Sequence, residues 1–408
     1  MSARIGVLSA VTGDDEATVV QVLAAERGVE VVRRCADLAE LLAAGAAGIG
    51  RVAVVSADLP GLDRAAVGHL HGSGVWVVVV AAAEDRGRVD GLGADAVTAA
   101  PGVAPAVQRV LDGGRPAAPA ADPGPPARPA DGVVVAVWGP TGAPGRTTVA
   151  VNLAAELAAR PAGRLPEGPT VLLVDADTYG GTVAQVLGLL DEAPGLAAAA
   201  RAAAAGRLDE VGLAALTPRL EGGLRVLTGL SRPDRWPEVP ATSLDLVWPA
   251  CRSLADVTVV DCGFCLEQDE ALTYDTRAPQ RNAATLSALA TADVVVVVGA
   301  GDPVGLQRLV RGLGALDELA LAARRRVVVN RVRASASGPR PGDAVREALR
   351  RYAGVVDAVV LPDDQVTCDG ALLHARTLAE HAPSSALRRA LAGLAAELVP
   401  AAVPAGAH

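Results

Sequence analysis

In residues 133–157, VVVAVWGPTGAPGRTTVAVNLAAEL, glycines, one cation and three hydroxyl groups lie between a run of valines and a helical pattern. Gly142 and Gly145 let backbone N–H groups approach a ligand closely, and the N-terminus of a helix expected at 147–159 attracts anions. Thr147 has its hydroxyl where phosphate-binding loops coordinate Mg²⁺, and Thr148 follows it. The spacing therefore predicts a strand, loop and helix that bind phosphate.

The cation of this loop is unusual, because all 37 Lys and Arg residues of the chain are Arg. Arg146 stands where the general motif G-x-x-x-x-G-K-[ST] has its Lys, and Pro140 stands where that motif has its first Gly. Pro144 removes one N–H donor from the loop. Because Arg is bulkier than Lys, we expect weakened nucleotide binding and slow or absent hydrolysis.

Four further strands of the same region end in polar residues. One buried strand that ends in Asp is ordinary, but several such ends beside a Gly-rich loop mark a binding crevice at one edge of a parallel sheet. The residues at these strand ends are Asp175 and Asp177, Asp261, Asn330, and the run Pro362, Asp363 and Asp364.

Length and composition predict a two-domain α/β protein. The 408 residues are 51% hydrophobic and only 2% aromatic, so the cores must consist of Ala, Val and Leu. Six prolines within residues 112–132 predict an extended linker between a domain at 1–111 and a second domain at 133–400. Residues 401–408 are expected to form a disordered tail.

Both domains alternate short apolar strands with helical segments, which predicts mostly parallel, doubly wound sheets. In the first, we expect strands at Arg4–Leu8, Val29–Arg33, Val52–Ser56, Trp76–Val80 and Ala96–Thr98, with helices at Asp14–Glu26 and Leu38–Ala44. In the second, we expect strands at 133–138, 171–174, 224–227, 257–260, 294–298, 327–330 and 358–361, with helices at 147–159, 182–189, 282–290, 303–319, 342–351 and 384–399.

The first domain resembles a response-regulator receiver over residues 3–112, on the stretches VAVVSADLPGLD, VWVVVVAAA and GADAVTAAP. Its chemistry is absent from the expected positions. Ser9 and Ala10 replace the acidic pair, Ser56 replaces the phospho-acceptor Asp, and Ala100 replaces the Lys before Pro101. Without a carboxylate cluster there is no metal site, so the resemblance implies docking or dimerisation. A receiver that uses Asp58 is the alternative.

The second domain resembles the MinD/ParA family of deviant Walker A ATPases. The loop TGAPGRTT is similar to the family's KGGxGKTT, VDADTYGG to its switch segment, VVDCG to Walker B, and VNR and LPDD to its two adenine-flanking loops. Together with the degenerate receiver, the chain resembles the branch of CpaE/TadZ pilus-assembly localisation proteins and actinobacterial septum-site-determining (Ssd-type) proteins.

The resemblance implies roles for individual residues. Asp177 would orient the attacking water, Arg146 would serve the phosphates, and Thr147, Asp175 and Asp261 would serve Mg²⁺. The phosphates of ATP or ADP would be surrounded by Gly142, Gly145, Arg146, Thr147 and Thr148, and adenine by Asn330, Pro362 and Asp363. Thr141 replaces the family's signature Lys, which reaches the nucleotide of the partner subunit in a homodimer. CpaE/TadZ relatives commonly vary at these Lys positions.

Two further segments bear on partners. Residues 266–282 follow the Walker B strand, and we expect an exposed loop with Arg277 and Arg281 available to a partner. The segment 384–399 places Leu387, Leu391, Leu394 and Leu398 on one face, which favours packing on the domain core over contact with a membrane.

These observations favour a cytoplasmic spatial regulator, recruited to the membrane, pole or septum. By resemblance it would bind ATP, hydrolyse it weakly or not at all, and act in septum placement or in localising a Tad pilus or secretion machine. One alternative is an active ParA-type ATPase that partitions DNA, which the net charge of −9 opposes and the cluster Arg324–Arg326, Arg331 and Arg333 favours. Another is a scaffold that binds no nucleotide. No apolar run is long enough to span a bilayer, and the odd number of cysteines, 5, without a secretory segment favours free thiols.

Overall fold

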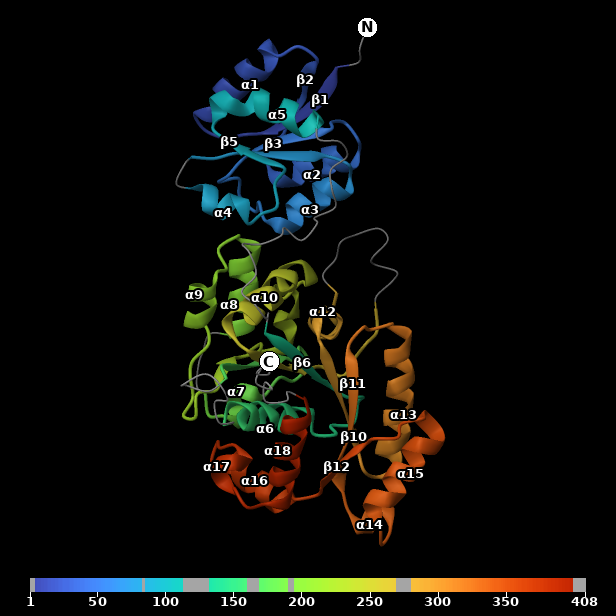
Figure 1. Ribbon diagram of the computed structural model, residues 1–408. Helices are drawn as coiled ribbons and strands as arrows, with labels where there is room; N and C mark the ends of the chain where they lie inside the picture. The colour runs from blue at the N-terminus through green and yellow to red at the C-terminus, as the bar shows by residue number, and fades with distance from the viewer. Residues whose placement is uncertain are drawn as a thin grey trace, which may run out of the picture. The chain divides into compact units, whose positions relative to one another are not determined.

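The computed structural model describes residues 4–82, 85–112, 132–159, 169–189, 194–268 and 280–398 (Figure 1). The chain forms two compact units, and each is described by itself. Outside the described residues lie most of the expected linker, all of the expected tail, and Arg277 of the segment 266–282.

The first unit is built on a five-stranded parallel sheet with the order β2-β1-β3-β4-β5. This is the flavodoxin-like, doubly wound order. Its strands are β1 (Ile5–Ala10), β2 (Val29–Arg34), β3 (Val52–Ser56), β4 (Trp76–Val80) and β5 (Ala96–Thr98). Its helices are α1 (Asp15–Ala25), α2 (Leu38–Ala46), α3 (Arg64–Gly72), α4 (Arg86–Asp90), the 3-10 turn η2 (Ala100–Gly102) and α5 (Val103–Asp112). All five strands occur where they were predicted, because continuous runs of valine fill a sheet that is covered on both faces.

The second unit has a seven-stranded sheet in which every neighbouring pair is parallel, with the order β12-β11-β10-β6-β9-β7-β8. Its strands are β6 (Val133–Trp138), β7 (Val171–Ala176), β8 (Arg225–Leu227), β9 (Val257–Cys262), β10 (Val294–Ala300), β11 (Arg324–Val332) and β12 (Val359–Pro362). The predicted strands and the α/β class are confirmed. Because β6 is central, the loop that follows it lies between the ends of β9 and β10.

The helices of the second unit lie between these strands and after the last of them, β12. They are α6 (Arg146–Ala158), α7 (Val183–Val186), α8 (Gly195–Ala204), α9 (Glu210–Ala215), the 3-10 turn η3 (Pro233–Glu238), α10 (Ala241–Leu254), α12 (Ala283–Thr291), α13 (Pro303–Glu318), α14 (Ala334–Ser337), α15 (Pro341–Ala353), α16 (Gln365–Leu373), α17 (Leu378–His381) and α18 (Ala386–Leu398). The helix predicted at 182–189 is wrong in length, because Gly188 adopts a φ of 64° and ends it after one turn.

Helices lie on both sides of the sheet of the second unit (Figure 1). Alternate residues of β6 face these two layers. Val135 and Val137 belong to a core shared with α6 and α18. On the other face, Trp138 meets α13, where a Cβ added at Gly312 would lie 3.1 Å from its ring. The sheet is therefore a central layer whose carboxyl-end loops are held between two sets of helices.

The last described helix, α18, packs on the core of the second unit, as its spacing of leucines predicted. Its side chains Leu387, Leu391, Leu394 and Leu398 are all buried. No helix within the described ranges combines the length and the apolar character needed to cross a bilayer.

Candidate functional site

The loop between β6 and α6 owes its shape to backbone conformations that favour glycine. Gly142 and Gly145 have φ of 105° and 93°, and Ala143 between them has 50°. A Cβ at Gly145 would lie 2.4 Å from Nδ2 of Asn330, which donates a hydrogen bond of 2.9 Å to the carbonyl of Pro144. The amide of Asn330 thus fixes the loop just before α6 begins, with the helix N-terminus behind it.

Arg146, the first residue of α6, turns its guanidinium inward. Its Nε donates to the carbonyl of Cys262 at 3.2 Å, and Nη1 lies 3.3 Å from the carbonyls of Gly139 and Pro140. Its Nη2 lies 3.5 Å from Oδ2 of Asp177, in a pair whose side chains are only 12% and 9% exposed. The cation of the loop is therefore held by the protein itself, and an anionic ligand must compete for it.

Thr147 and Asp261 form the pair that suits a divalent cation. The hydroxyl of Thr147 donates a 2.6 Å hydrogen bond to Oδ2 of Asp261, which lies at the end of β9. The other oxygen, Oδ1, is buried and has no hydrogen-bond partner in the part of the chain that the structure describes. Burial and the nearby Asp175 carboxyl raise the pKa of Asp261 well above its ordinary value, against the lowering effects of Thr147 and Arg146.

An unpartnered buried carboxylate oxygen beside a hydroxyl is the kind of site that Mg²⁺ uses when phosphates complete its shell. The protein offers such a cation one carboxylate and one hydroxyl. No group of three or more His, Cys, Asp or Glu side chains within the described ranges is arranged to hold a metal. The pair Cys262 and Cys265 consists of free thiols.

Asp175, which the resemblance assigned to Mg²⁺, has both carboxylate oxygens bonded to backbone N–H groups. It is opposite Asp261 in the ladder between β7 and β9 and is only 2% exposed. Its Oδ1 accepts from the N–H of Asp177 at 3.2 Å and its Oδ2 from the N–H of Val183 at 3.1 Å. Burial raises the pKa of Asp175 to about 7. The carboxyl therefore shapes the loop after β7, and the pairing of β7 with β9 brings it close to Asp261.

Asp177 lies two residues beyond Asp175 and joins this loop to Arg146. Its Oδ1 accepts from the N–H groups of Tyr179 at 2.9 Å and Gly180 at 3.2 Å, while its Oδ2 faces the guanidinium. The predicted Asp177 and Arg146 are thus brought into direct contact.

The residues predicted to flank adenine share one pocket of about 410 Å³. Thr148 lines it from α6, Asn330 from the end of β11, and Pro362 and Asp363 from the end of β12. Arg333 lies 3.6 Å from Asp363 across its mouth. These residues, spread over more than 200 positions of sequence, therefore form a cavity directly beside the N-terminus of α6.

The helix α6 is anchored to the last segment of the unit. Oδ1 of Asn152 accepts from the N–H of Leu378 at 2.6 Å. One turn later, Glu156, only 5% exposed, pairs with Arg388 of α18 through bonds of 2.6 and 2.8 Å. These contacts fix the axis of the helix whose N-terminus faces the site.

An aromatic cluster joins the loops after β7 and β9. The rings of Tyr179 and Phe264 have centroids 4.9 Å apart, and the guanidinium of Arg281 lies 4.1 Å from the centroid of Tyr179. Arg281 also donates to the carbonyl of Thr178 at 3.0 Å. The expectation that Arg281 is freely available to a partner is therefore wrong, because stacking and backbone contact already hold it.

Arg308 of α13 was not among the predicted residues, although it contacts the loop. A Cβ added at Gly142 would lie 2.1 Å from its Nη1. It lines a cavity of about 40 Å³ with Thr141 and Pro144, and a larger one of about 850 Å³ with Thr141 and Glu267. A single Arg on a helix distant in sequence carries no motif, so only the fold places it here.

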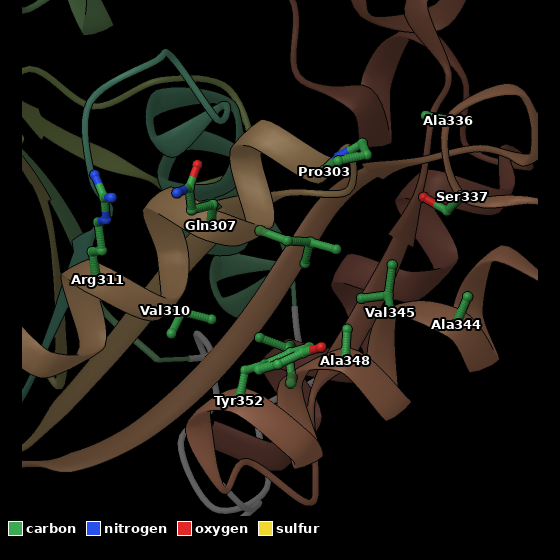
Figure 2. A pocket seen from close by; sticks show the side chains of 12 residues that line it. Pro303, Gln307, Val310, Arg311, Ala336, Ser337, Ala344, Val345, Ala348 and Tyr352 are labelled. Carbon is green, nitrogen blue, oxygen red and sulfur yellow. The ribbon is translucent and has the colours of Figure 1, made fainter.

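A separate cavity of about 540 Å³ lies between α13 and α15 (Figure 2). Apolar side chains dominate it, including Val310, Val345 and Tyr352, whereas Arg311 extends away from them in Figure 2. It contains none of the predicted site residues, and its lining is mainly apolar.

In the first unit, β3 ends in a buried serine. The hydroxyl of Ser56, at the end of β3, accepts a 2.9 Å hydrogen bond from the N–H of Thr12 and is buried. Ser9 is buried as well, and Asp58 is exposed. A small hydroxyl thus ties the end of β3 to the loop that follows β1.

Comparison with known proteins places these features in a known fold. No family model and no curated protein matches the sequence. Among solved structures, the chain is similar to a ParA family ATPase from Chlorobium tepidum TLS, with 20% identity, a TM-score of 0.53, and 66% of this chain and 99% of that chain covered. It is also similar to the cell division ATPase MinD of Pyrococcus furiosus, with 20% identity, a TM-score of 0.51, and 65% and 98% covered.

A third similar structure is the septum site-determining protein MinD from Pyrococcus horikoshii OT3, which was solved in complex with Mg-ADP. It has 19% identity and a TM-score of 0.50, and the likeness covers 66% of this chain and 96% of that chain. The chain therefore contains the fold of the ParA and MinD ATPases.

Proposed function

We propose that this protein is a nucleotide-dependent switch that binds Mg·ATP or Mg·ADP at the loop between β6 and α6. The observation that supports this most is the pair of Thr147 and Asp261, whose free carboxylate oxygen lies at the helix N-terminus beside the loop glycines. The pocket around Asn330 and Pro362 supplies space for the base next to it. Mg-ADP in the MinD structure from Pyrococcus horikoshii supports the same ligand class.

The residues of this chain would act mainly by positioning charge. Arg146 would leave Asp177 and the three carbonyls to meet the phosphates, while Thr147 and Asp261 would hold the cation. Asp175 would keep the loop after β7 in place and is not part of the proposed metal site. Bound Mg²⁺ would neutralise negative charge on the phosphate oxygens.

We further propose that hydrolysis is slow. Asp177 is the candidate to orient a water, but in the free protein it is paired with Arg146. Loss of one phosphate-clamping cation typically costs several kcal/mol at the transition state, and Thr141 supplies none. The protein would then spend long periods in each nucleotide state, which suits a switch better than a motor.

The decisive experiment is calorimetric titration of the full chain with Mg·ATP and Mg·ADP. The variants are Arg146→Ala and, as a charge-matched control, Arg350→Ala, whose ion pair with Glu347 is exposed on α15. We expect binding that Arg146→Ala weakens at least tenfold and Arg350→Ala leaves unchanged. Absence of binding at millimolar nucleotide would reject the switch and support the scaffold. Phosphate release from the same samples measures turnover.

The finer role that we propose is spatial regulation of septum placement or of a Tad pilus or secretion machine. The ATPase fold is shared with a cell division ATPase and with a septum site-determining protein. The receiver-like unit would dock the protein, and nucleotide would control a homodimer. A fluorescent fusion that stays evenly distributed in dividing cells, and a deletion without a division or pilus defect, would contradict this role.

DNA partitioning is the less favoured function, because most arginines of the cluster that favoured it already form ion pairs or hydrogen bonds within the protein. Arg325 pairs with Asp317, Arg326 with Glu397, and Arg333 with Asp363. Arg324 donates to the carbonyl of Leu398. A salt-dependent DNA titration that shows tight binding at low salt would reverse this preference.

A further inference from the structure

We propose that Arg308 of α13 is a second phosphate-binding cation, which serves the terminal phosphate of a bound nucleoside triphosphate from within the same chain. This inference rests on the proposed nucleotide site. It assigns a cation at that site to α13, which carries no phosphate motif.

The first step is the fixed approach of α13 to the loop. The helix follows β10, which pairs with β6, so both lead to the same edge of the sheet. A Cβ at Gly312 would lie 3.1 Å from the ring of Trp138 and 3.3 Å from Pro140, and a Cβ at Gly305 would lie 2.6 Å from the carbonyl oxygen of Ala300. Glycines on α13 therefore let it pack directly on the start of the loop.

The second step is the position of the guanidinium. Arg308 lies one turn before Gly312, and its Nη1 occupies the space that a side chain at Gly142 would fill. The two residues also line one small cavity together with Pro140, Thr141 and Asp302. The cation is thus held against the arm of the loop that leads away from β6, while the base pocket lies on the other side, at Thr148 and Asn330.

The third step is charge. Arg308 has no ion pair or hydrogen bond to any described residue, and its side chain is exposed. Asp302, which shares the small cavity, has Oδ1 engaged by the N–H groups of Val304 and Gly305 at the start of α13. Arg146, by contrast, already faces Asp177. An incoming triphosphate therefore meets one cation that must be released from a carboxylate and one that is unpaired.

The fourth step is the direction in which a bound nucleotide would extend its phosphates. A nucleotide whose base fills the pocket at Asn330 extends its phosphates across the N-terminus of α6. The phosphate farthest from the base then reaches the part of the loop that contains Gly142 and Arg308. Guanidinium groups are well suited to phosphate because their planar fork offers paired donors. The loss of Arg308 should therefore weaken binding of the triphosphate more than binding of the diphosphate.

Calorimetry with Mg·ATP and Mg·ADP on the full chain tests this assignment. The variants are Arg308→Ala, Arg308→Lys, and Arg350→Ala as the control that removes the same charge elsewhere. We expect Arg308→Ala to lower the affinity for Mg·ATP at least tenfold and the affinity for Mg·ADP by less than about threefold. Arg308→Lys should recover part of the loss, and Arg350→Ala should match the wild type.

Two results would overturn the assignment while leaving the nucleotide switch intact. In one, the wild type binds Mg·ATP and Arg308→Ala binds it equally well. In the other, Arg308→Ala weakens ATP and ADP equally and lowers the melting temperature, which indicates a structural role. A wild type that binds neither nucleotide would overturn both proposals, and Arg146→Ala measured alongside separates these cases.

Discussion

Replacing Asp177 with Asn should strengthen nucleotide binding, although Asp177 lies within the proposed site. In the free protein Asp177 holds Arg146 at 3.5 Å between side chains that are almost buried. The change removes the negative charge but keeps an oxygen that can accept from the N–H groups of Tyr179 and Gly180. The loop is therefore preserved while Arg146 is released for phosphate.

The size of the effect follows from the geometry of the pair. At 3.5 Å and an effective dielectric constant of about 20, the Coulomb attraction is about 5 kcal/mol before desolvation is counted. Desolvation of both groups cancels much of this attraction in pairs that are buried. We expect a net gain in binding of about 1.4 to 2.8 kcal/mol, which is about ten- to a hundredfold in Kd.

The assay is calorimetric titration with Mg·ATP for the wild type and Asp177→Asn. Asp343→Asn, an exposed carboxylate on α15, is the control for net charge. Most of the gain should disappear when Arg146→Ala is combined with Asp177→Asn, because the released cation is then absent. Unchanged or weakened binding by Asp177→Asn alone would refute the idea that Asp177 restrains Arg146. Phosphate release should fall in the same variant.

Three further predictions test other parts of the structure. Thr147→Val keeps the shape of the side chain but removes the hydroxyl. The ratio of nucleotide affinity in Mg²⁺ to that in EDTA should therefore fall about tenfold. Leu391→Ala in the fully buried face of α18 should lower the free energy of unfolding in urea by about 2 to 5 kcal/mol, whereas a membrane-binding helix would show almost no change. Burial raises the pKa of Cys251 to about 12, so the thiolate is scarce below that pH, and a thiol reagent at pH 8 should label the partly exposed Cys265 first and Cys251 only on unfolding.

The strands and the location of the site were accessible from sequence, because both depend on local patterns. Runs such as Val294–Val298 indicate buried parallel strands wherever they occur, and the carboxyl ends of such strands lie at one edge. That rule alone brings Asp261 and Asn330 to the loop. The helix α8 was not among the predicted helices, and its sequence, GLAAAARAAA, consists almost entirely of Ala.

The orientation of charged side chains within the site was not accessible from sequence. The spacing around Arg146 predicts a cation at a phosphate loop, but its inward turn depends on the carbonyl of Cys262 and on Asp177, which lie on other strands. The same holds for Asp175, whose bonds to backbone N–H groups depend on how the chain bends at Gly181. The position of Arg308 beside the loop depends on the packing of α13 against Pro140, which the sequence does not reveal.

The attachment of α6 to the last helices has a consequence for how the protein is made. The phosphate-loop helix is synthesised early, yet its partners Leu378 and Arg388 lie more than 200 residues later in the chain. Until those residues leave the ribosome, the buried Glu156 lacks its cation and α6 lacks part of its cover. Ribosome-bound chains that end before α16 should therefore fail to retain nucleotide, so that competence to switch appears only at the end of translation.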